Sequence, residues 1–337
     1  MEMLLNRLGL LANFVLVPGL PYGSQLALGA LGVTMVYAVL NFSNFSHGEV
    51  MSFGAMITIL ATHWLQSNGL SISPLPTALL ALPFGILGTI GLCLLLDRLV
   101  FRFYRHQRAS SVTYLIVSIG VMFVIGGVIR FIIGPHDRNF NDGDRFLLKA
   151  REFKEISGLS EGLAIKSSQA ITVFTAVIVV TAIFWFLNRT RTGKSMRAYA
   201  DNQDLALLSG INPDRVVGIT WIITAGLAAV AGTLYGLDKS YKPLVYLHLV
   251  LPIFAAAIVG GVGNPLGAIV GGFVIAFSEL LLTFAYKKVA AYLFGEGLFG
   301  DGLLQILSTD YKLAVSFMIL VVVLLIKPTG IFSGKSL

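Results

Sequence analysis

The sequence is poor in charge: only 12% of its 337 residues are Asp, Glu, Lys or Arg, against about 25% in a typical soluble domain. This composition argues against a water-soluble globular protein. Cysteine is scarce as well, since Cys93 is the single one and lies in an apolar run, which excludes an intramolecular disulfide. The five histidines are scattered without the spacing of metal ligands, so neither a metal site nor a cofactor is predicted.

Long apolar runs take the place of charge. A helix of about 20 apolar residues crosses a bilayer, and runs of that length recur along the whole chain without the alternation of barrel strands. The sequence therefore predicts an all-α, polytopic membrane bundle of eight or nine spans, in a single transmembrane domain over residues 1–337, with broken or re-entrant segments. The candidate spans are residues 23–41, 50–66, 77–99, 112–133, 169–187, 216–237, 248–261, 266–285 and 311–327. The run 248–261 is short, and the sequence leaves open whether it crosses or re-enters.

Basic residues gather in short segments between the apolar runs, where they set orientation. Segment 98–111 holds four arginines and no acid, and segment 188–215 holds five Lys or Arg, so both are expected on the cytoplasmic side. Segment 134–168 balances six basic residues against six acidic ones and is expected outside. The net charge of +7 thus has an explanation that needs no nucleic-acid partner.

The N-terminal segment has an apolar core from Leu8 to Val17 and loosely resembles a signal peptide. It lacks an A-x-A cleavage pattern and more apolar runs follow it, so it is expected to be retained. With nine spans, the N-terminus is expected outside.

Two polar, helix-breaking segments stand between apolar runs, one in each half of the chain. Paired interruptions of this kind mark the substrate path of many transporters, although the sequence leaves open whether they form a true repeat. Glu279 lies within a span, where a carboxylate usually faces a partner or a wet cavity, and both roles remain open. The candidates for a translocation path are Asn41, Asn44, Ser46, His47 and Glu49 in the first segment, Gly260, Gly261, Gly263 and Asn264 in the second, and Glu279.

Gly263, Gly267 and Gly271 recur every four residues. In lipid, such a glycine face lets two helix backbones approach closely. Helix packing within the chain is the expected role of Gly267 and Gly271, and this is compatible with a close-packed wall of the path.

Two further motifs resemble ligand-binding loops but lack residues that those loops need. Thr192–Ser195 reads Thr-Gly-Lys-Ser, but Asn188 stands where a phosphate loop needs its first glycine and a span precedes it, so ATP binding by this chain is not expected. Asp137–Gly143 resembles a calcium loop, but its glycine stands at position seven instead of six, and a solvated turn is the better interpretation.

Residues 188–215 form a polar, basic segment between two long apolar runs. Asp201 or Asn202 is expected to cap a short helix that ends before Gly210, with leucines on its apolar face. Pro213 is expected to delay the next helix until Val216. A short helix of this kind fits a groove on another protein; an amphipathic segment at the membrane interface is the alternative.

Residues 196–216, MRAYADNQDLALLSGINPDRV, resemble the cytoplasmic coupling loop of ABC-importer permeases of the branched-chain amino-acid family. Residues 41–56, NFSNFSHGEVMSFGAM, and 260–281, GGVGNPLGAIVGGFVIAFSELL, are similar to the N-terminal and C-terminal signatures of that family. The three segments stand in the order of the family, and the resemblance extends across most of the chain. Asp204 is a departure, because a glutamate is common there, and its shorter reach puts the contact with the ATPase in doubt.

This resemblance implies one permease subunit of a bacterial importer in the inner membrane. The implied partners are a second homologous permease subunit, two ATP-binding cassette subunits, a periplasmic solute-binding protein and the lipid bilayer. The chain itself is then a transport subunit and not an enzyme. The residues that the resemblance assigns to ATPase coupling are Arg197, Asp204, Ala206, Leu207, Gly210 and Ile211.

The implied solute is a branched-chain amino acid. A permease for urea or short-chain amides has similar signatures and remains an alternative. An ion-coupled secondary transporter is a further alternative, against which stand the coupling-like loop and the lack of a paired acid relay.

Overall fold

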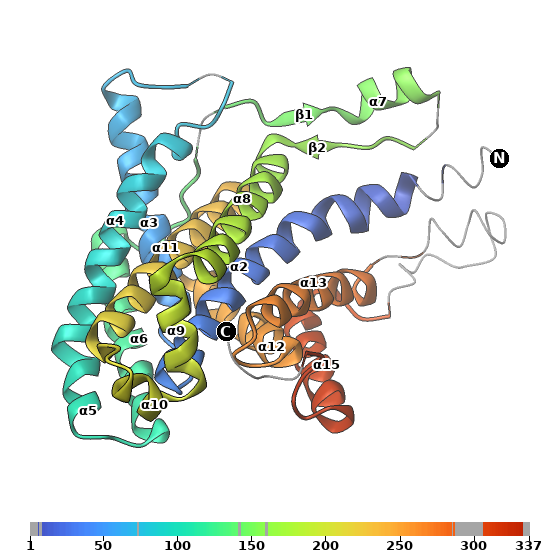
Figure 1. The fold of residues 1–337 in the computed structure, drawn as a ribbon. Helices are drawn as coiled ribbons and strands as arrows, with labels where there is room; N and C mark the ends of the chain where they lie inside the picture. The colour runs from blue at the N-terminus through green and yellow to red at the C-terminus, as the bar shows by residue number, and fades with distance from the viewer. Residues whose placement is uncertain are drawn as a thin grey trace.

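Long helices lie side by side in the computed structural model, which describes residues 6, 9–72, 74–140, 143–158, 161–284, 286 and 306–332 (Figure 1). The helices of the first half are η1 (Ala12–Leu16), α2 (Val17–Leu40), α3 (His47–Ser67), α4 (Ala78–Leu96), η2 (Asp97–Phe101), α5 (Arg102–His106) and α6 (Ser111–Ile133). Then follow α7 (Ala150–Ser157), α8 (Ser167–Arg189), α9 (Arg191–Asp201), α10 (Gln203–Leu208), α11 (Pro213–Lys239), α12 (Pro243–Gly260), α13 (Pro265–Leu282), η3 (Thr309–Tyr311) and α15 (Lys312–Ile326). Strands β1 (Phe146–Leu148) and β2 (Ile165–Lys166) pair antiparallel.

In the described part of the chain, seven helices are long and apolar enough to cross a membrane. The 21-residue α3 and the 15-residue α15 pack among them, which gives nine elements side by side. The prediction of an all-α, polytopic membrane bundle is confirmed.

The first and seventh predicted spans need correction at their boundaries. The first helix begins at Gly9 and not near residue 23, so the apolar N-terminal segment is part of that span. The run 248–261 belongs to α12, whose 18 residues form an unbroken helix through Pro252. At 1.5 Å per residue this helix is about 27 Å long, close to the thickness of the apolar layer of a bilayer.

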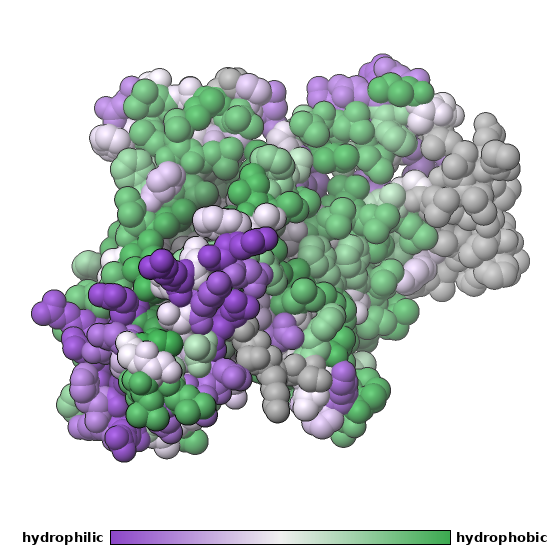
Figure 2. Space-filling view, viewed as in Figure 1, coloured by the Kyte–Doolittle hydropathy of each residue, from purple (hydrophilic) through white to green (hydrophobic). Residues whose placement is uncertain are grey.

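The bundle has two polar ends, separated by an apolar surface (Figure 2). At one end, here the α9–α10 end, Gln203 Nε2 donates to the Val39 carbonyl (3.2 Å), and Arg105 pairs with Asp214 (3.3 Å). At the other, the β1–β2 end, the Ala164 amide donates to Asn13 Oδ1 (2.9 Å), which ties the N-terminal helix to the loop before β2. Segments 98–111 and 188–215 therefore share one end, and segment 134–168 lies at the opposite one.

The antiparallel pair α2 and α11 forms the centre of the bundle. The hairpin α3–α4 packs on α11 as the hairpin α12–α13 packs on α2, and α6 covers α3 as α15 covers α12. Each helix runs opposite to its counterpart between the two ends. The chain is therefore built from two quartets of helices with inverted topology, an arrangement found in many transporters.

This repeat pairs different segments from those that the sequence suggested. Residues 41–46 join α2 to α3, so their counterpart is 240–242, which joins α11 to α12. Residues 261–264 join the two helices of the second hairpin and correspond to 68–77 in the first. The similarity of the two polar segments reflects their common need to break a helix and not an equivalent position.

Glycines bring the two helices of the α12–α13 hairpin into close contact. A Cβ at Gly267 would meet the carbonyl of Gly260, and a Cβ at Gly271 would meet that of Ala256. Gly263 is different: it has φ +88°, has no neighbour within 4 Å of a Cβ, and forms the turn before α13. The four-residue glycine spacing therefore contains two packing positions and one turn position.

We expect Gly271→Val to destabilise the protein by about 1–3 kcal/mol, because the added side chain overpacks a backbone contact that cannot move apart without separating the hairpin. Thermal unfolding in detergent measures the effect. Gly91→Val is the matched control, since a Cβ at Gly91 has nothing within 4 Å. Equal stability of the two variants would contradict the packing role.

Candidate functional site

Helices α9 and α10 form a bent unit, called the elbow below, whose turns are fixed by local hydrogen bonds. Thr190 Oγ1 caps α9 by accepting from the Gly193 amide (3.0 Å), and Asn202 Oδ1 caps α10 by accepting from the Leu205 amide (3.0 Å). Gly210 ends the unit with φ +79°, a conformation that costs an L-residue about 1–2 kcal/mol. The short capped helix predicted from the sequence is present.

The start of α11 differs from the expectation. Pro213 does not delay the helix until Val216; it is the first residue of α11. Asn212 precedes it as the cap, with Oδ1 accepting from the Arg215 amide (3.2 Å). Proline suits this position because the first turn of a helix leaves its N–H groups unpaired in any case.

Most of the surface of α10 is apolar and exposed. Leu205 is 60% exposed and Leu208 84% exposed, whereas Ala206 is 3% exposed and faces the bundle. Leu207 is exposed as well, and Asp204 lies in the first turn. The C-terminal turn of α10 is closed by the Ile211 amide, which donates to the Ala206 carbonyl (3.0 Å). A leucine surface on a rigid, protruding helix is a suitable knob for a groove on another protein.

A charged cluster beside the elbow joins η2 and α5 to α11. Asp97 accepts from Arg105 (2.9 Å) and from the indole N–H of Trp221 on α11 (2.9 Å). Arg105 also reaches Asp214 at the start of α11. Burial raises the pKa of the Tyr199 phenol of α9 above its ordinary value, although the nearby Arg105 guanidinium acts in the opposite direction. These bonds therefore hold η2 and α5 against α11, next to Tyr199 of α9.

Sequence reasoning missed this cluster. Asp97 and Asp214 are 117 positions apart in the chain, and only Asp214 lies in one of the segments that resemble family signatures. The isolated acid at the end of a predicted span was the available signal, because a lone carboxylate beside several arginines usually has a partner.

The first path segment divides into a local cap and two buried side chains. Asn44 Oδ1 accepts from the Ser46 hydroxyl (2.7 Å) and amide (3.2 Å), and Asn41 ends α2 with φ +54°. His47 is 1% exposed and lies against Gly32 of α2. Glu49 is 3% exposed and lies against Gly126 of α6. The two side chains thus face different helices, and Asn44 and Ser46 bind each other.

The second path segment is a tight turn at the α9–α10 end. Asn264 caps α13 by accepting from the amides of Leu266 (3.1 Å) and Gly267 (3.2 Å). Gly261, with φ +111°, lies against the carbonyl of Phe332. Gly260 is part of the hairpin contact described above. These residues shape the backbone, and their side chains offer little to a solute.

Glu279 is 1% exposed and joins three helices. It accepts from the Tyr22 hydroxyl of α2 (2.9 Å) and from the Ser316 hydroxyl of α15. The Lys239 ammonium lies 4.4 Å from the centre of the Tyr22 ring. A carboxylate in this setting has its partners, as the cost of burying it requires. Tyr22 and Ser316 were not identified from the sequence, since a hydroxyl in an apolar run has many roles.

The second-half candidates are thus not gathered at one point: Gly260 to Asn264 lie at the α9–α10 end, whereas Glu279 lies toward the other end of α13. Residues 41–46 follow the end of α2, so they begin at the α9–α10 end.

Comparison with known proteins adds independent evidence. The family described as "Branched-chain amino acid transport system / permease component" matches residues 15–324. The chain is similar to the high-affinity branched-chain amino acid transport system permease protein LivH of Salmonella typhimurium, with 31% identity over 93% of this chain and 92% of that one, and to LivH of Escherichia coli strain K12, with 30% identity over the same shares. It is also similar to BraD of Pseudomonas aeruginosa, a permease protein of the same description, with 31% identity over 94% of each chain. No solved structure matches.

We expect Glu279→Leu to destabilise the protein, because the Tyr22 and Ser316 hydroxyls then lose their acceptor at a buried position, at a cost of about 1–3 kcal/mol for each unpaired group. Glu279→Gln keeps an acceptor oxygen in the same place and should lose much less stability. Thermal unfolding of both variants in detergent compares them, and similar losses would argue against the network.

Proposed function

This chain belongs to the family of branched-chain amino acid transport system permease components, and from that premise we propose that it is the membrane-spanning subunit of a bacterial ABC importer for branched-chain amino acids. It is a multi-pass membrane protein, and we place it in the inner membrane. We further propose that it acts with a second permease subunit, two ATP-binding cassette subunits and a periplasmic solute-binding protein, with the α9–α10 end in the cytoplasm.

The single observation that carries the proposal is the protruding α10 knob on an anchored elbow. Its leucines are exposed at a basic end of the bundle, Gln203 of α10 donates to the Val39 carbonyl at the end of α2, and the preceding α9 packs against both α2 and α11, the two central helices. A push on this surface therefore reaches both quartets of the inverted repeat. The relatives named above are described as branched-chain amino acid permeases, which favours that solute over urea or short-chain amides.

The mechanism follows from this arrangement. ATP-driven closure of the cassette subunits moves the elbows of the two permeases. Because α9 packs against α11, and the Asp97–Arg105–Asp214 cluster fixes α11 to η2 and α5, we expect the movement to tilt these helices as rigid bodies instead of unwinding them. Tilting of the two inverted quartets against each other then exposes the path alternately to the two sides. Arg197 supports the elbow from within, since its guanidinium donates to Asn188 at the end of α8 (3.1 Å).

We expect Asp204→Lys to lower ATP-driven uptake at least tenfold while membrane insertion stays normal, because the change reverses a charge on the knob and touches no buried group. Uptake of L-leucine into proteoliposomes that hold the assembled importer measures this. Glu155→Lys on α7, an exposed acid at the opposite end, is the matched control and should leave uptake unchanged. Normal uptake by the Asp204 variant would remove the residue from the coupling surface.

A second expectation concerns the energy source. The purified chain alone in liposomes should transport no leucine down a proton or sodium gradient, because the knob receives motion that separate ATPases generate. Radiolabelled uptake under an imposed gradient tests this. Robust gradient-driven uptake would support an ion-coupled transporter and overturn the proposal.

A further inference from the structure

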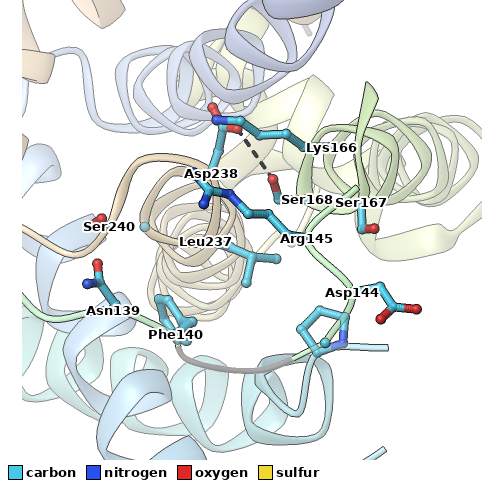
Figure 3. Close-up of a pocket in the computed structure, with 13 residues that line it drawn as sticks. Asn139, Phe140, Asp144, Arg145, Lys166, Ser167, Ser168, Leu237, Asp238 and Ser240 are labelled. Carbon is cyan, nitrogen blue, oxygen red and sulfur yellow. Dashed lines mark hydrogen bonds between the residues drawn. The ribbon is translucent and has the colours of Figure 1, made fainter. Parts of the chain in front are cut away.

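A polar cavity of about 460 Å³ opens at the β1–β2 end, beside the end of the central helix α11 (Figure 3). Pockets for small ligands have volumes of about 300–1,000 Å³. The lining comes from four places: Pro76 in the loop between α3 and α4, the segment before β1, Lys166 of β2 with the start of α8, and the last turn of α11 with Ser240. The cavity is thus bounded by elements that belong to both quartets and by the loop that joins them.

Of the charged residues that line the cavity, Arg145, Lys166 and Asp238 converge without forming ion pairs, whereas Asp144 points away from them (Figure 3). Arg145 and Lys166 extend toward the Asp238 carboxylate (Figure 3), yet none of the ion pairs formed within 4.0 Å in the described part of the chain involves these three residues. Asp238 accepts instead from the Ser168 hydroxyl (3.4 Å). Arg145 is exposed, and Lys166 and Asp238 are partly exposed, so their charged groups remain open to solvent and to a ligand in the cavity.

The convergence of two basic groups and one acid in the cavity favours one kind of ligand over others. An anion alone would meet the repulsion of Asp238, and a cation alone would meet that of Arg145 and Lys166. A zwitterion satisfies both signs, because its carboxylate can bind the two basic groups while its ammonium binds the acid. Phe140 and Leu237 line another part of the same cavity and offer an apolar surface for a side chain.

We propose that this cavity is a reception site for the amino acid, in which Asp238 binds the ammonium group, Arg145 and Lys166 bind the carboxylate, and Phe140 and Leu237 contact the apolar side chain. The inference rests on the proposed function, since it places the same solute at the mouth of the same chain. An occupant held here touches the end of α11, the helix whose other end is bound to Arg105 of α5 through Asp214.

Saturation-transfer NMR tests the site directly, with the importer assembled in nanodiscs, L-leucine as the probe, and neither binding protein nor ATP present. We expect the wild-type protein to give signals from the leucine methyl groups. Asp238→Asn and the double variant Arg145→Gln/Lys166→Gln should each weaken binding about tenfold or more, the size expected for loss of a charge-assisted hydrogen bond. The analogues 4-methylpentanoate and 3-methylbutylamine each keep one charge and should bind more weakly than leucine.

Matched controls separate recognition from folding. Arg151→Gln and Glu155→Gln remove charges of both signs from the exposed face of the nearby α7 and should leave binding unchanged. Ser168→Ala removes the hydrogen bond to Asp238 but keeps every charge, so binding should fall much less than with Asp238→Asn. A loss as large as that of Asp238→Asn would show a structural role for Asp238 and overturn the proposal.

The remaining outcomes distinguish the two proposals. If the wild-type importer takes up leucine and both charge variants bind leucine like the wild type, the reception site alone is wrong. If those variants bind leucine normally but fail to capture the solute-binding protein, the cavity is a protein-docking surface, and the reception site is again wrong. If the wild-type importer transports no amino acid under ATP, both proposals fall.

Discussion

Burial of α2 on nearly every side is the constraint on which the rest of the structure depends. Most spans have a face that is exposed on the outside of the bundle. On α2 the corresponding residues are small or apolar and are covered by neighbouring side chains. Examples are Gly19 against Phe277 and Gly32 against His47. The antiparallel α11 packs along it and is nearly as buried. In lipid the hydrophobic effect does not drive helices together, so such a centre depends on close fit between backbones and small side chains. The two hairpins pack around this pair, and their inverted arrangement follows from its antiparallel direction.

Polar groups inside the bundle act as ties between particular helices. Glu279 connects α13 to α2 and α15, and Asp97 connects α4 to the arginine of α5 and to Trp221 of α11. An unpaired carboxylate in an apolar layer is costly, so each of these acids fixes the relative position of the helices that supply its partners. The first tie lies toward the β1–β2 end of the bundle and the second at the α9–α10 end. Each of these bonds therefore holds particular helices together where the remaining contacts are apolar.

The central helix α11 connects the two places to which function is assigned above. Its first turn carries Asp214, which binds Arg105 in the anchored cluster, and its last turn carries Asp238, which faces the cavity. One rigid helix of 27 residues thus links the surface that would receive motion to the site that would receive solute. The helix ends sharply at Ser240, whose φ of +73° turns the chain so that Tyr241 bridges to Arg138.

The sequence by itself determined the class of the molecule, the shared end of segments 98–111 and 188–215, and the capped helix at Gln203–Leu208. These features depend on local chemistry: apolar runs of fixed length, the position of arginines, and an Asn followed at the right distance by Gly. Only the tertiary structure decided which segments are equivalent in the repeat, which partners Glu279 and Asp97 bind, and that Arg145, Lys166 and Asp238 surround one cavity. The repeat is one of packing and direction, which leaves no mark in composition. The polar contacts join residues up to 257 positions apart, and no periodicity within a span says which neighbour it will meet.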